Sequence, residues 1–456
     1  MTIRAFEIVL LVAALSACVS TGSSIEPFGC WTGAWRLADG SGLTLSRMPD
    51  GGLRWRLEDG GTGKLVQAGD EWRNSTGWTD LPANVPATFG DCPDGLLSFE
   101  GQTAHRLDLS IVETKFKGDG ETLQGRLVLP PGDTPVPILV EVHGSERDAA
   151  TQFNFFQQMA PAMGIGVFVY DKRGTGGSTG QYTQDFSLLA ADAAAAVSEA
   201  RRLAGERALN VGLHGSSQGG WVAPLAARLS PVDFVIVGYG LAVSPLAENR
   251  AETVQDVADA GYDLSAQAAA GELADAAGVI MASGFRAGFA ELNRLKTSRR
   301  NEPWYGHARG EFTGEFVRYP SWMLQIGGPW SATGTTWAHD PEPDLRALDV
   351  PILWILAAQD TEAPIEETRA RLLALAAENR PITVVSFPDS EHGMREFQVD
   401  ETGRRVFTRY SEGYFRIVAD WARNQRLSPT GYGRMEVLAD GGRKQSAWFK
   451  GRRTGK

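Results

Sequence analysis

The chain has 456 residues, of which 43% are hydrophobic and 22% are charged, as in an ordinary soluble globular protein. At roughly 150 residues per domain, this length suggests about three structural units. Acidic residues outnumber basic ones by 55 to 44, which gives a formal charge of −11 at pH 7. This surplus argues against a nucleic-acid-binding protein, because binding to phosphates needs a basic face. Three cysteines are too few for a fold built on disulfides.

The N-terminal residues have the features of a secretory signal. Arg4 precedes a run of ten apolar or small residues, 8–17, which ends at Cys18. That run is too short to cross about 30 Å of hydrocarbon as a helix, which takes about 20 residues. A basic start, a short apolar core and a small-residue exit predict a signal peptide over residues 1–17. The tetrad 15–18 resembles the bacterial lipobox, which implies a lipid on Cys18 and an anchor in the cell envelope, with the outer membrane favoured.

The predicted location in the cell envelope bears on the redox state of the other two cysteines. With Cys18 lipidated, Cys30 and Cys92 remain in an oxidising compartment, where two thiols usually pair. We therefore expect a Cys30–Cys92 disulfide, which would stabilise the N-terminal unit by about 3–4 kcal/mol.

Residues 25–105 predict a small β-rich domain. Short alternating runs such as 43–45 and 53–57 are separated by Asp-Gly pairs at 39–40, 50–51 and 59–60. Alternation with such turns is typical of antiparallel hairpins. The segment also holds five tryptophans, which we interpret as core residues rather than a binding surface: Trp31, Trp35, Trp55, Trp72 and Trp78.

Residues 107–425 predict an α/β domain. A hairpin formed by 107–116 and 123–129 precedes apolar, β-branched runs that alternate with helical stretches such as 188–203. This alternation indicates βαβ units and a mostly parallel sheet of eight strands, with helices on both faces and an insertion at 241–340 after the sixth strand. The six runs after the hairpin are 138–142, 166–170, 211–213, 234–237, 352–356 and 383–387.

The basic, glycine-spaced residues 426–456 predict a solvated tail.

Ser217 is the candidate nucleophile. It lies at the centre of Gly215-Ser216-Ser217-Gln218-Gly219, which matches G-x-S-x-G between a predicted strand and a predicted helix. A turn that exposes a serine hydroxyl there is strained and leaves no room for side chains two residues to either side, which the glycines satisfy. The start of the helix also places a positive dipole end beside a developing oxyanion.

A serine nucleophile needs a histidine base that a carboxylate orients. When the acid and the base follow the nucleophile in the chain, as in this type of turn, the base is expected after the last parallel strand. His392 occupies that position, whereas the other five histidines precede the serine or lie in the insertion. Asp360 ends the preceding strand and is the favoured acid. Asp389 and Asp340 are the alternatives, which we interpret as a turn residue and a capping residue.

The segment from about 107 to 423, without its insertion, resembles the α/β-hydrolase superfamily, in particular its serine esterases and serine aminopeptidases. The motifs that carry the resemblance are 142–145, 170–178, the turn at Ser217 and the loops at Asp360 and His392. The resemblance implies that the N–H groups of Ser145 and Gln218 form the oxyanion hole. It also makes the insertion a lid, whose rings either form an apolar underside or pack its core: Trp304, Tyr305, Trp322, Trp330 and Trp337. Asp171 and Arg173 are interpreted as an ion pair that locks a turn.

These features favour a lipid-anchored serine hydrolase that cleaves carboxylic esters through an acyl-enzyme. One alternative is a serine peptidase of the aminopeptidase or dipeptidyl-peptidase kind, which would need a lid carboxylate such as Glu302 or Glu311 to bind a free amine. Another is a non-catalytic binding lipoprotein of the cell envelope. We expect a small ester or peptide as substrate, and neither a cofactor nor a metal, because no histidine or cysteine pair has metal-ligand spacing.

Overall fold

The computed structural model describes residues 31–48, 52–68, 71–83, 87–89 and 97–441. The predicted signal peptide, Cys18, Cys30 and Cys92 lie outside the described residues, and so does the expected disulfide. None of the helices in the described ranges is long and apolar enough to cross a membrane.

The N-terminal residues form an antiparallel sheet. Its turns at Asp39-Gly40 and Asp59-Gly60 place each glycine at positive φ (+89° and +100°), as a tight turn between strands requires. Trp35 and Trp55 are buried in its core, as expected, together with leucines and Phe99. Within the described part, the order is β5-β4-β3-β2-β1-β8-β7-β6, formed by β1 (Gly33–Leu37), β2 (Gly42–Arg47), β3 (Leu53–Leu57), β4 (Thr62–Ala68), β5 (Glu71–Thr76), β6 (Ala87–Phe89), β7 (Leu97–Phe99) and β8 (Gln102–Arg106).

A larger mixed sheet follows, and it contains all eight strands expected from the sequence. Strands β11 to β16 of this sheet run parallel, whereas β9 and β10 form the antiparallel hairpin at one edge. Counted over the described residues, the order is β20-β16-β15-β14-β13-β11-β12-β10-β9, with β9 (Ser110–Lys117), β10 (Thr122–Leu129), β11 (Val136–Val142), β12 (Gly166–Tyr170), β13 (Ala208–Ser216), β14 (Val235–Gly238), β15 (Ile352–Ala357), β16 (Ile382–Phe387) and β20 (Glu436–Asp440).

Strand β20 corrects the expectation of a wholly solvated tail. Residues 436–440 pair antiparallel with β16, and Leu438 and Ala439 pack against the core of the domain. The physical reason is that β16 would otherwise leave an open edge of unpaired N–H and C=O groups. The short apolar run in the tail therefore covers the edge of β16 and adds one strand to the sheet, although basic residues surround it in the sequence.

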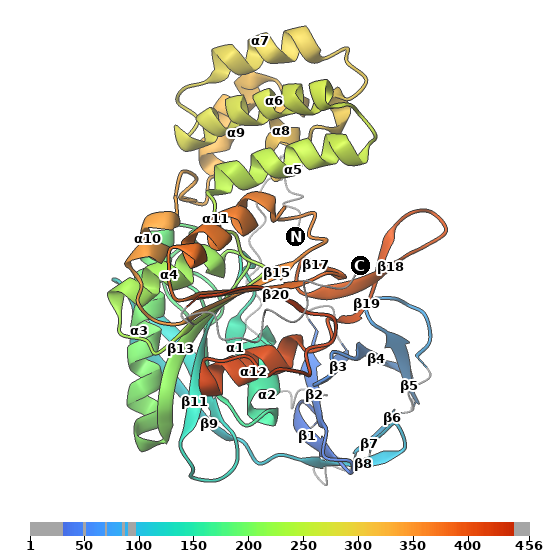
Figure 1. Ribbon diagram of the computed structural model, residues 1–456, viewed down its shortest axis with the longest axis vertical. Coiled ribbons are helices and arrows are strands. Elements are labelled where there is room, and N and C mark those ends of the chain that lie inside the picture. The colour runs from blue at the N-terminus through green and yellow to red at the C-terminus, as the bar shows by residue number, and fades with distance from the viewer. Residues whose placement is uncertain (1–30, 49–51, 69–70, 84–86, 90–96, 442–456) are drawn as a thin grey trace, which may run out of the picture.

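Helices cover both faces of this sheet (Figure 1). On one face, α3 (Phe186–Ala204), α4 (Gly219–Leu229), α10 (Glu342–Ala347) and α11 (Glu366–Ala377) contribute to one hydrophobic core. On the other face, α2 (Phe156–Ala162) and α12 (Tyr414–Asn424) contribute to a second core. The short α1 (Ala150–Phe153) and the 3₁₀ turn η1 (Gly205–Arg207) connect these elements.

The insertion between β14 and β15 forms a helical layer of its own above the body (Figure 1). Trp304, Tyr305 and Trp337 pack into the core of this layer, whereas Trp322 and Trp330 on α9 are 63% and 90% exposed. Three of the five expected aromatic rings therefore stabilise the lid itself. Its helices are α5 (Pro245–Asp259), α6 (Leu264–Ala282), α7 (Phe289–Arg299), η2 (Tyr305–His307), α8 (Thr313–Arg318) and α9 (Ser321–Ser331).

A small third sheet, which we did not predict, lies between the body and the N-terminal sheet. In the described C-terminal part it consists of β17 (Ser390–Glu391), β18 (Arg395–Val399) and β19 (Arg405–Tyr410). The Tyr410 N–H donates to the Gly60 carbonyl (2.8 Å) and the Trp78 N–H to the Phe407 carbonyl (3.0 Å). The N-terminal sheet is thus bonded through its backbone to the segment that follows His392 (Figure 1).

Candidate active site

Ser217 lies in a tight turn between β13 and α4. Its φ is +53°, a conformation that is uncommon for a residue with a side chain and that often marks a functional site. A Cβ atom at position 215 would lie 2.3 Å from the Gly219 carbonyl oxygen, and one at position 219 would lie 2.1 Å from that of Val142. Both positions therefore require glycine, as the sequence motif predicts. The Ser217 N–H is held by the Gly238 carbonyl (3.1 Å).

The structure brings Ser217, His392 and Asp360 together in series. The Ser217 Oγ lies 3.2 Å from Nε2 of His392, whose Nδ1 lies 2.9 Å from Oδ2 of Asp360. The other carboxylate oxygen of Asp360 accepts the N–H groups of Glu362 (3.1 Å) and Ala363 (2.8 Å), which fixes the plane of the carboxylate. Asp360 and His392 are buried, whereas Ser217 is half-buried. These distances allow a proton to pass from the serine to the imidazole.

The rival carboxylates have other partners. Asp389 forms an ion pair with Arg434, and Asp340 forms one with Arg371. Asp340 also accepts the N–H of Glu342 at the start of α10, which agrees with a capping residue.

The charge of Asp360 acts on the ionisation of His392. Burial opposes the charged imidazolium, but the negative charge and the hydrogen bond of Asp360 outweigh it and raise the pKa of His392 above its ordinary value of 6.5. The neutral imidazole that can accept a proton therefore predominates only above this raised pKa. The same interaction stabilises the imidazolium formed when a serine proton is transferred.

Two more strained residues lie beside the histidine. Tyr239 has φ +43° and Met394 has φ +56°. The Tyr239 ring meets the His392 ring edge-on, with centroids 5.0 Å apart and an interplanar angle of 76°. Positive φ values therefore occur at Ser217, at Tyr239 beside the imidazole and at Met394 two residues after His392, a clustering that is typical of catalytic sites.

Gln218, one predicted oxyanion donor, directly follows the serine, and Ser145, the other, directly follows Gly144. Gly144 approaches Ser217 so closely that a Cβ atom at position 144 would lie 3.3 Å from the Ser217 Cβ. Gln218 directly precedes α4, so its N–H group is at the positive end of the helix dipole. Over the described residues, neither N–H group donates to a backbone carbonyl. The two N–H groups thus remain candidates for binding an oxyanion.

The expected Asp171–Arg173 ion pair is wrong. Arg173 instead binds both carboxylate oxygens of Asp192 on α3, at 2.7 and 2.8 Å. Asp171 accepts hydrogen bonds from the Thr151 N–H (2.9 Å) and the Gly177 N–H (2.8 Å). The reason is geometric, because the planar guanidinium fork matches a carboxylate that faces it from the helix. A bond of this kind cannot be identified from neighbouring residues in the sequence.

The loop of His392 is supported from the N-terminal sheet. The Arg395 Nε donates to the His392 carbonyl (2.8 Å), and its guanidinium lies over the rings of Phe407 (4.4 Å) and Trp78 (5.7 Å). Trp78 follows β5 and also meets Tyr410 edge-on, at 5.0 Å. Arg395 therefore links the N-terminal sheet to the backbone of the candidate base.

We expect Trp78→Ala to lower kcat roughly 5- to 30-fold, because losing a cation–π contact of about 1–2 kcal/mol would loosen the His392 loop. Trp78→Phe should restore most of kcat. Trp72→Ala is the matched control, since Trp72 packs edge-on against Trp31 (5.4 Å) within the same sheet. Steady-state kinetics with an ester substrate would measure the effect. A folded Trp78→Ala protein with wild-type kcat would show that the contact has no positioning role.

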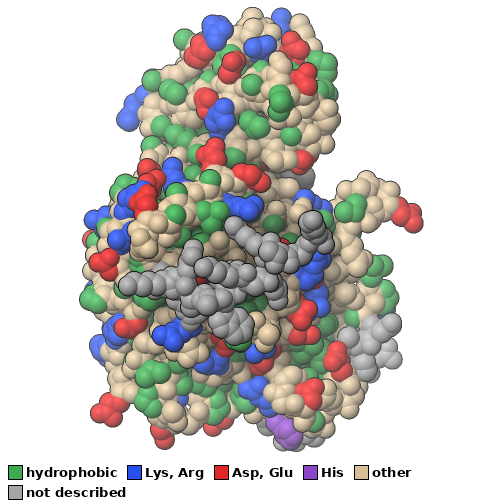
Figure 2. Space-filling view, viewed as in Figure 1, with side chains coloured by type: hydrophobic (Ala, Val, Ile, Leu, Met, Phe, Trp, Pro, Cys, Tyr) green, Lys and Arg blue, Asp and Glu red, His purple; other side chains and the backbone are tan. Residues whose placement is uncertain are grey.

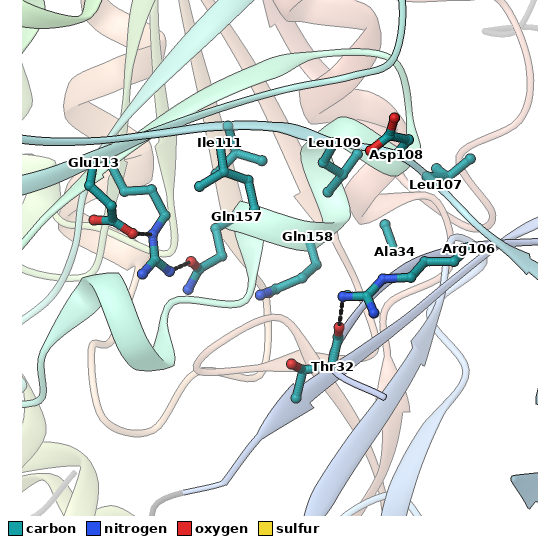
Figure 3. A pocket seen from close by; sticks show the side chains of 13 residues that line it. Thr32, Ala34, Arg106, Leu107, Asp108, Leu109, Ile111, Glu113, Gln157 and Gln158 are labelled. Atoms are coloured by element: carbon teal, nitrogen blue, oxygen red, sulfur yellow. Dashed lines mark hydrogen bonds and ion pairs between the residues drawn. The ribbon is translucent and has the colours of Figure 1, made fainter. Parts of the chain in front are cut away.

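A cavity of about 570 Å³ lies elsewhere, between the N-terminal sheet, the β9–β10 hairpin and α2 (Figure 3). Both arginines that line it have partners: Arg126 bonds Glu113 (2.5 Å) and Gln157 (2.6 Å), and Arg106 bonds the Thr32 carbonyl (3.0 Å). The predicted site residues are absent from its described lining.

On the face drawn in Figure 2, acidic and basic side chains are interspersed over both the lid and the body.

Comparison with known proteins supports this architecture. A sequence profile of the family described as serine aminopeptidase, S33, matches residues 133–260, which include β11, the turn at Ser217 and α4. The chain has the α/β-hydrolase fold. In this fold, the loops that carry positions 217, 360 and 392 follow the carboxyl ends of parallel strands and meet at one edge of the sheet.

Solved structures of similar proteins include both esterases and a peptidase. An esterase of Pyrococcus furiosus is 13% identical, with 62% of this chain and 84% of that chain covered at a TM-score of 0.41. An acylaminoacyl peptidase of Pyrococcus horikoshii is 14% identical, with 77% and 52% covered at 0.38. A bacterial brefeldin A esterase is 18% identical, with 63% and 70% covered at 0.39. A search of curated proteins finds no match.

Proposed function

We propose that the protein is a serine hydrolase that cleaves carboxylic esters through an acyl-enzyme. The single observation that carries the proposal is the unbroken series of contacts from the Ser217 Oγ through His392 to Asp360, at 3.2 and 2.9 Å. A serine hydroxyl bonded to a buried, carboxylate-bound imidazole is an activated nucleophile.

In the proposed reaction, Ser217 attacks the ester carbonyl while Nε2 of His392 takes its proton. The N–H groups of Ser145 and Gln218 stabilise the oxyanion of the tetrahedral intermediate. As the carbon–oxygen bond to the alcohol breaks, His392 returns the proton to the leaving alcohol. Water, deprotonated by the same imidazole, then attacks the acyl-serine, and the imidazolium returns that proton to the Ser217 oxygen as the carboxylic acid leaves. Asp360 stays ionised throughout and orients the imidazole.

The same site could hydrolyse a peptide with a free amine, and one observation favours this second candidate. Glu362 Oε1 lies 3.9 Å from Nε2 of His392. In the lid, burial and neighbouring carboxylates raise the pKa of Glu311 to about 7 and that of Glu252 to about 9. A substrate ammonium bound among these carboxylates would restore their charge and offset its own desolvation. Glu302, the other lid carboxylate considered, is exposed.

A substrate panel tests the assignment. We expect the purified protein to hydrolyse p-nitrophenyl esters of graded chain length with a kcat/KM at least about 100-fold above that for aminoacyl-anilides. This ratio would correspond to about 2.7 kcal/mol of difference in transition-state binding. A higher kcat/KM for aminoacyl-anilides than for the esters, lost in Glu311→Gln, would establish the peptidase instead. Hydrolysis of neither class would contradict both candidates.

We propose, in addition, that the enzyme is attached to the envelope through a lipid on Cys18, so that the site faces the periplasm. The support for this is the apolar run at 8–17 and the small residues before the cysteine.

A further inference from the structure

The loop that carries the candidate oxyanion donor Ser145 is fixed from outside by two side chains. The Lys172 ammonium donates to the Gly144 carbonyl (2.5 Å), and the Tyr182 hydroxyl donates to the Ser145 carbonyl (2.6 Å). Tyr182 is itself held by the side-chain amide of Gln184 (3.0 Å). Two consecutive carbonyl groups of this loop thus have fixed directions.

The Lys172 contact has a direct consequence for the Ser145 N–H. The Gly144 carbonyl and the Ser145 N–H belong to one planar trans peptide group, in which C=O and N–H point in opposite directions. Holding the oxygen on one side therefore fixes the N–H on the other. A positive charge at the carbonyl oxygen also polarises the amide and makes its N–H a stronger donor.

The charges around Lys172 explain why a cation is needed at this place. A Cβ atom at position 144 would lie only 2.8 Å from Oε2 of Glu146, so a carboxylate adjoins the loop where an oxyanion would form. Glu146 is 3.2 Å from Nδ1 of His143. Burial raises the pKa of Glu146, but the hydrogen bond and charge of His143, followed by the charge of Lys172, outweigh it and bring this pKa down to about 2. An uncompensated Glu146 would repel the oxyanion.

Lys172 itself is buried, with only 3% of its surface exposed. Burial lowers its pKa to about 8, against the opposing attraction of Glu146. The other groups that face it are Arg147 and Asp148 of the same loop and the ring of Tyr182, whose centroid lies 5.3 Å from the ammonium. A lysine in this setting changes its charge within the range in which hydrolases are assayed.

We propose that Lys172 is a positioning residue for the oxyanion hole, which orients and polarises the Gly144–Ser145 peptide and offsets the charge of Glu146. This inference rests on the proposed serine hydrolase function. Lys172 should therefore affect kcat rather than KM, because the oxyanion forms only after the serine has attacked the bound substrate.

The experiment compares wild type, Lys172→Met and Lys172→Arg in the hydrolysis of a p-nitrophenyl ester between pH 6 and pH 10. We expect Lys172→Met to lower kcat about 10- to 100-fold with little change in KM, somewhat less than the loss of a whole oxyanion donor. Wild-type kcat should fall as the pH rises through about 8, where Lys172 loses its proton. This fall should be absent in Lys172→Met and should move beyond pH 10 in Lys172→Arg.

Lys296→Met is the matched control. Lys296 is a partly buried lid lysine that donates to the carbonyls of Phe316 and Tyr319 (both 2.6 Å), and burial lowers its pKa as well. The Lys296→Met variant should keep the wild-type kcat and the wild-type fall in kcat above about pH 8. If the wild type is active and a folded Lys172→Arg protein shows the same fall in kcat above about pH 8, the inference on Lys172 is overturned and the proposed function is not. A wild type that hydrolyses no ester would overturn the proposed function and this inference with it.

Discussion

Ser217→Ala should lower kcat for ester hydrolysis by a factor on the order of 10⁶ and leave KM nearly unchanged. The substitution removes the hydroxyl that lies 3.2 Å from His392 and leaves the rest of the turn in place. A residual rate above that in water is expected, because the oxyanion donors and the binding surface remain. Single-turnover and steady-state assays with the same ester would measure the loss.

The chain provides a matched control in the same turn. Ser216 is the neighbouring serine of the motif, at the end of β13, and its hydroxyl is not part of the proposed series of contacts. Ser216→Ala should therefore retain kcat within about tenfold of wild type. The opposite result, with Ser216→Ala inactive and Ser217→Ala active, would show that Ser216 rather than Ser217 is the nucleophile.

Asp360→Asn should lower kcat by about 10⁴-fold, because the amide cannot stabilise the imidazolium or hold the reactive tautomer of His392. It should also change the acid limb of the pH profile. The neutral imidazole is the active form, so activity is lost as the pH falls through the raised pKa of His392. Without the negative charge of Asp360 this pKa falls, and the midpoint of the acid limb should move to lower pH.

The pH dependence of kcat/KM for wild type and Asp360→Asn would measure both effects. Asp389→Asn is the control, since Asp389 is a rival carboxylate in the same loop region that pairs with Arg434. It should retain the activity and the acid limb of wild type. If Asp389→Asn rather than Asp360→Asn lost activity, the orienting carboxylate would have to be reassigned.

The parts of the structure that the sequence predicts well are those fixed by local requirements. The turn at Ser217 needs glycines at 215 and 219, and both have backbone carbonyls where a side chain would be. The parallel strands β11 to β16 appear as apolar, β-branched runs because both faces of the sheet are covered by helices. The positions of Asp360 and His392 then follow from the ends of β15 and β16.

The features that escaped prediction depend on contacts between distant residues. Strand β20 forms because it pairs with the otherwise open edge of β16, and the hairpin β18–β19 forms between the body and the N-terminal sheet. The partner of Arg173 is Asp192, which lies within an alanine-rich helix whose sequence pattern indicates only helix. The contact of Lys172 with Gly144 joins the ends of two adjacent strands. Each required the three-dimensional arrangement to be known.

The lid shows the same limit for aromatic residues. Trp304 and Trp330 are both tryptophans of one insertion, yet the first is buried in the lid core and the second is almost fully exposed. Helical spacing alone did not separate them, because the packing of α5 to α9 decides which ring is covered. The sequence correctly indicated an inserted helical layer, but it did not indicate which of its aromatic side chains are buried and which are exposed.

The most direct test of the central claim is covalent labelling of the protein with a fluorophosphonate, followed by mass spectrometry of its peptides. We predict one label per chain, on the Ser217 hydroxyl, formed quickly in wild type, slowly in Asp360→Asn and not at all in Ser217→Ala. A wild-type protein that stays unlabelled, or that carries its label on another residue, would contradict the assignment of a serine hydrolase that uses Ser217, His392 and Asp360.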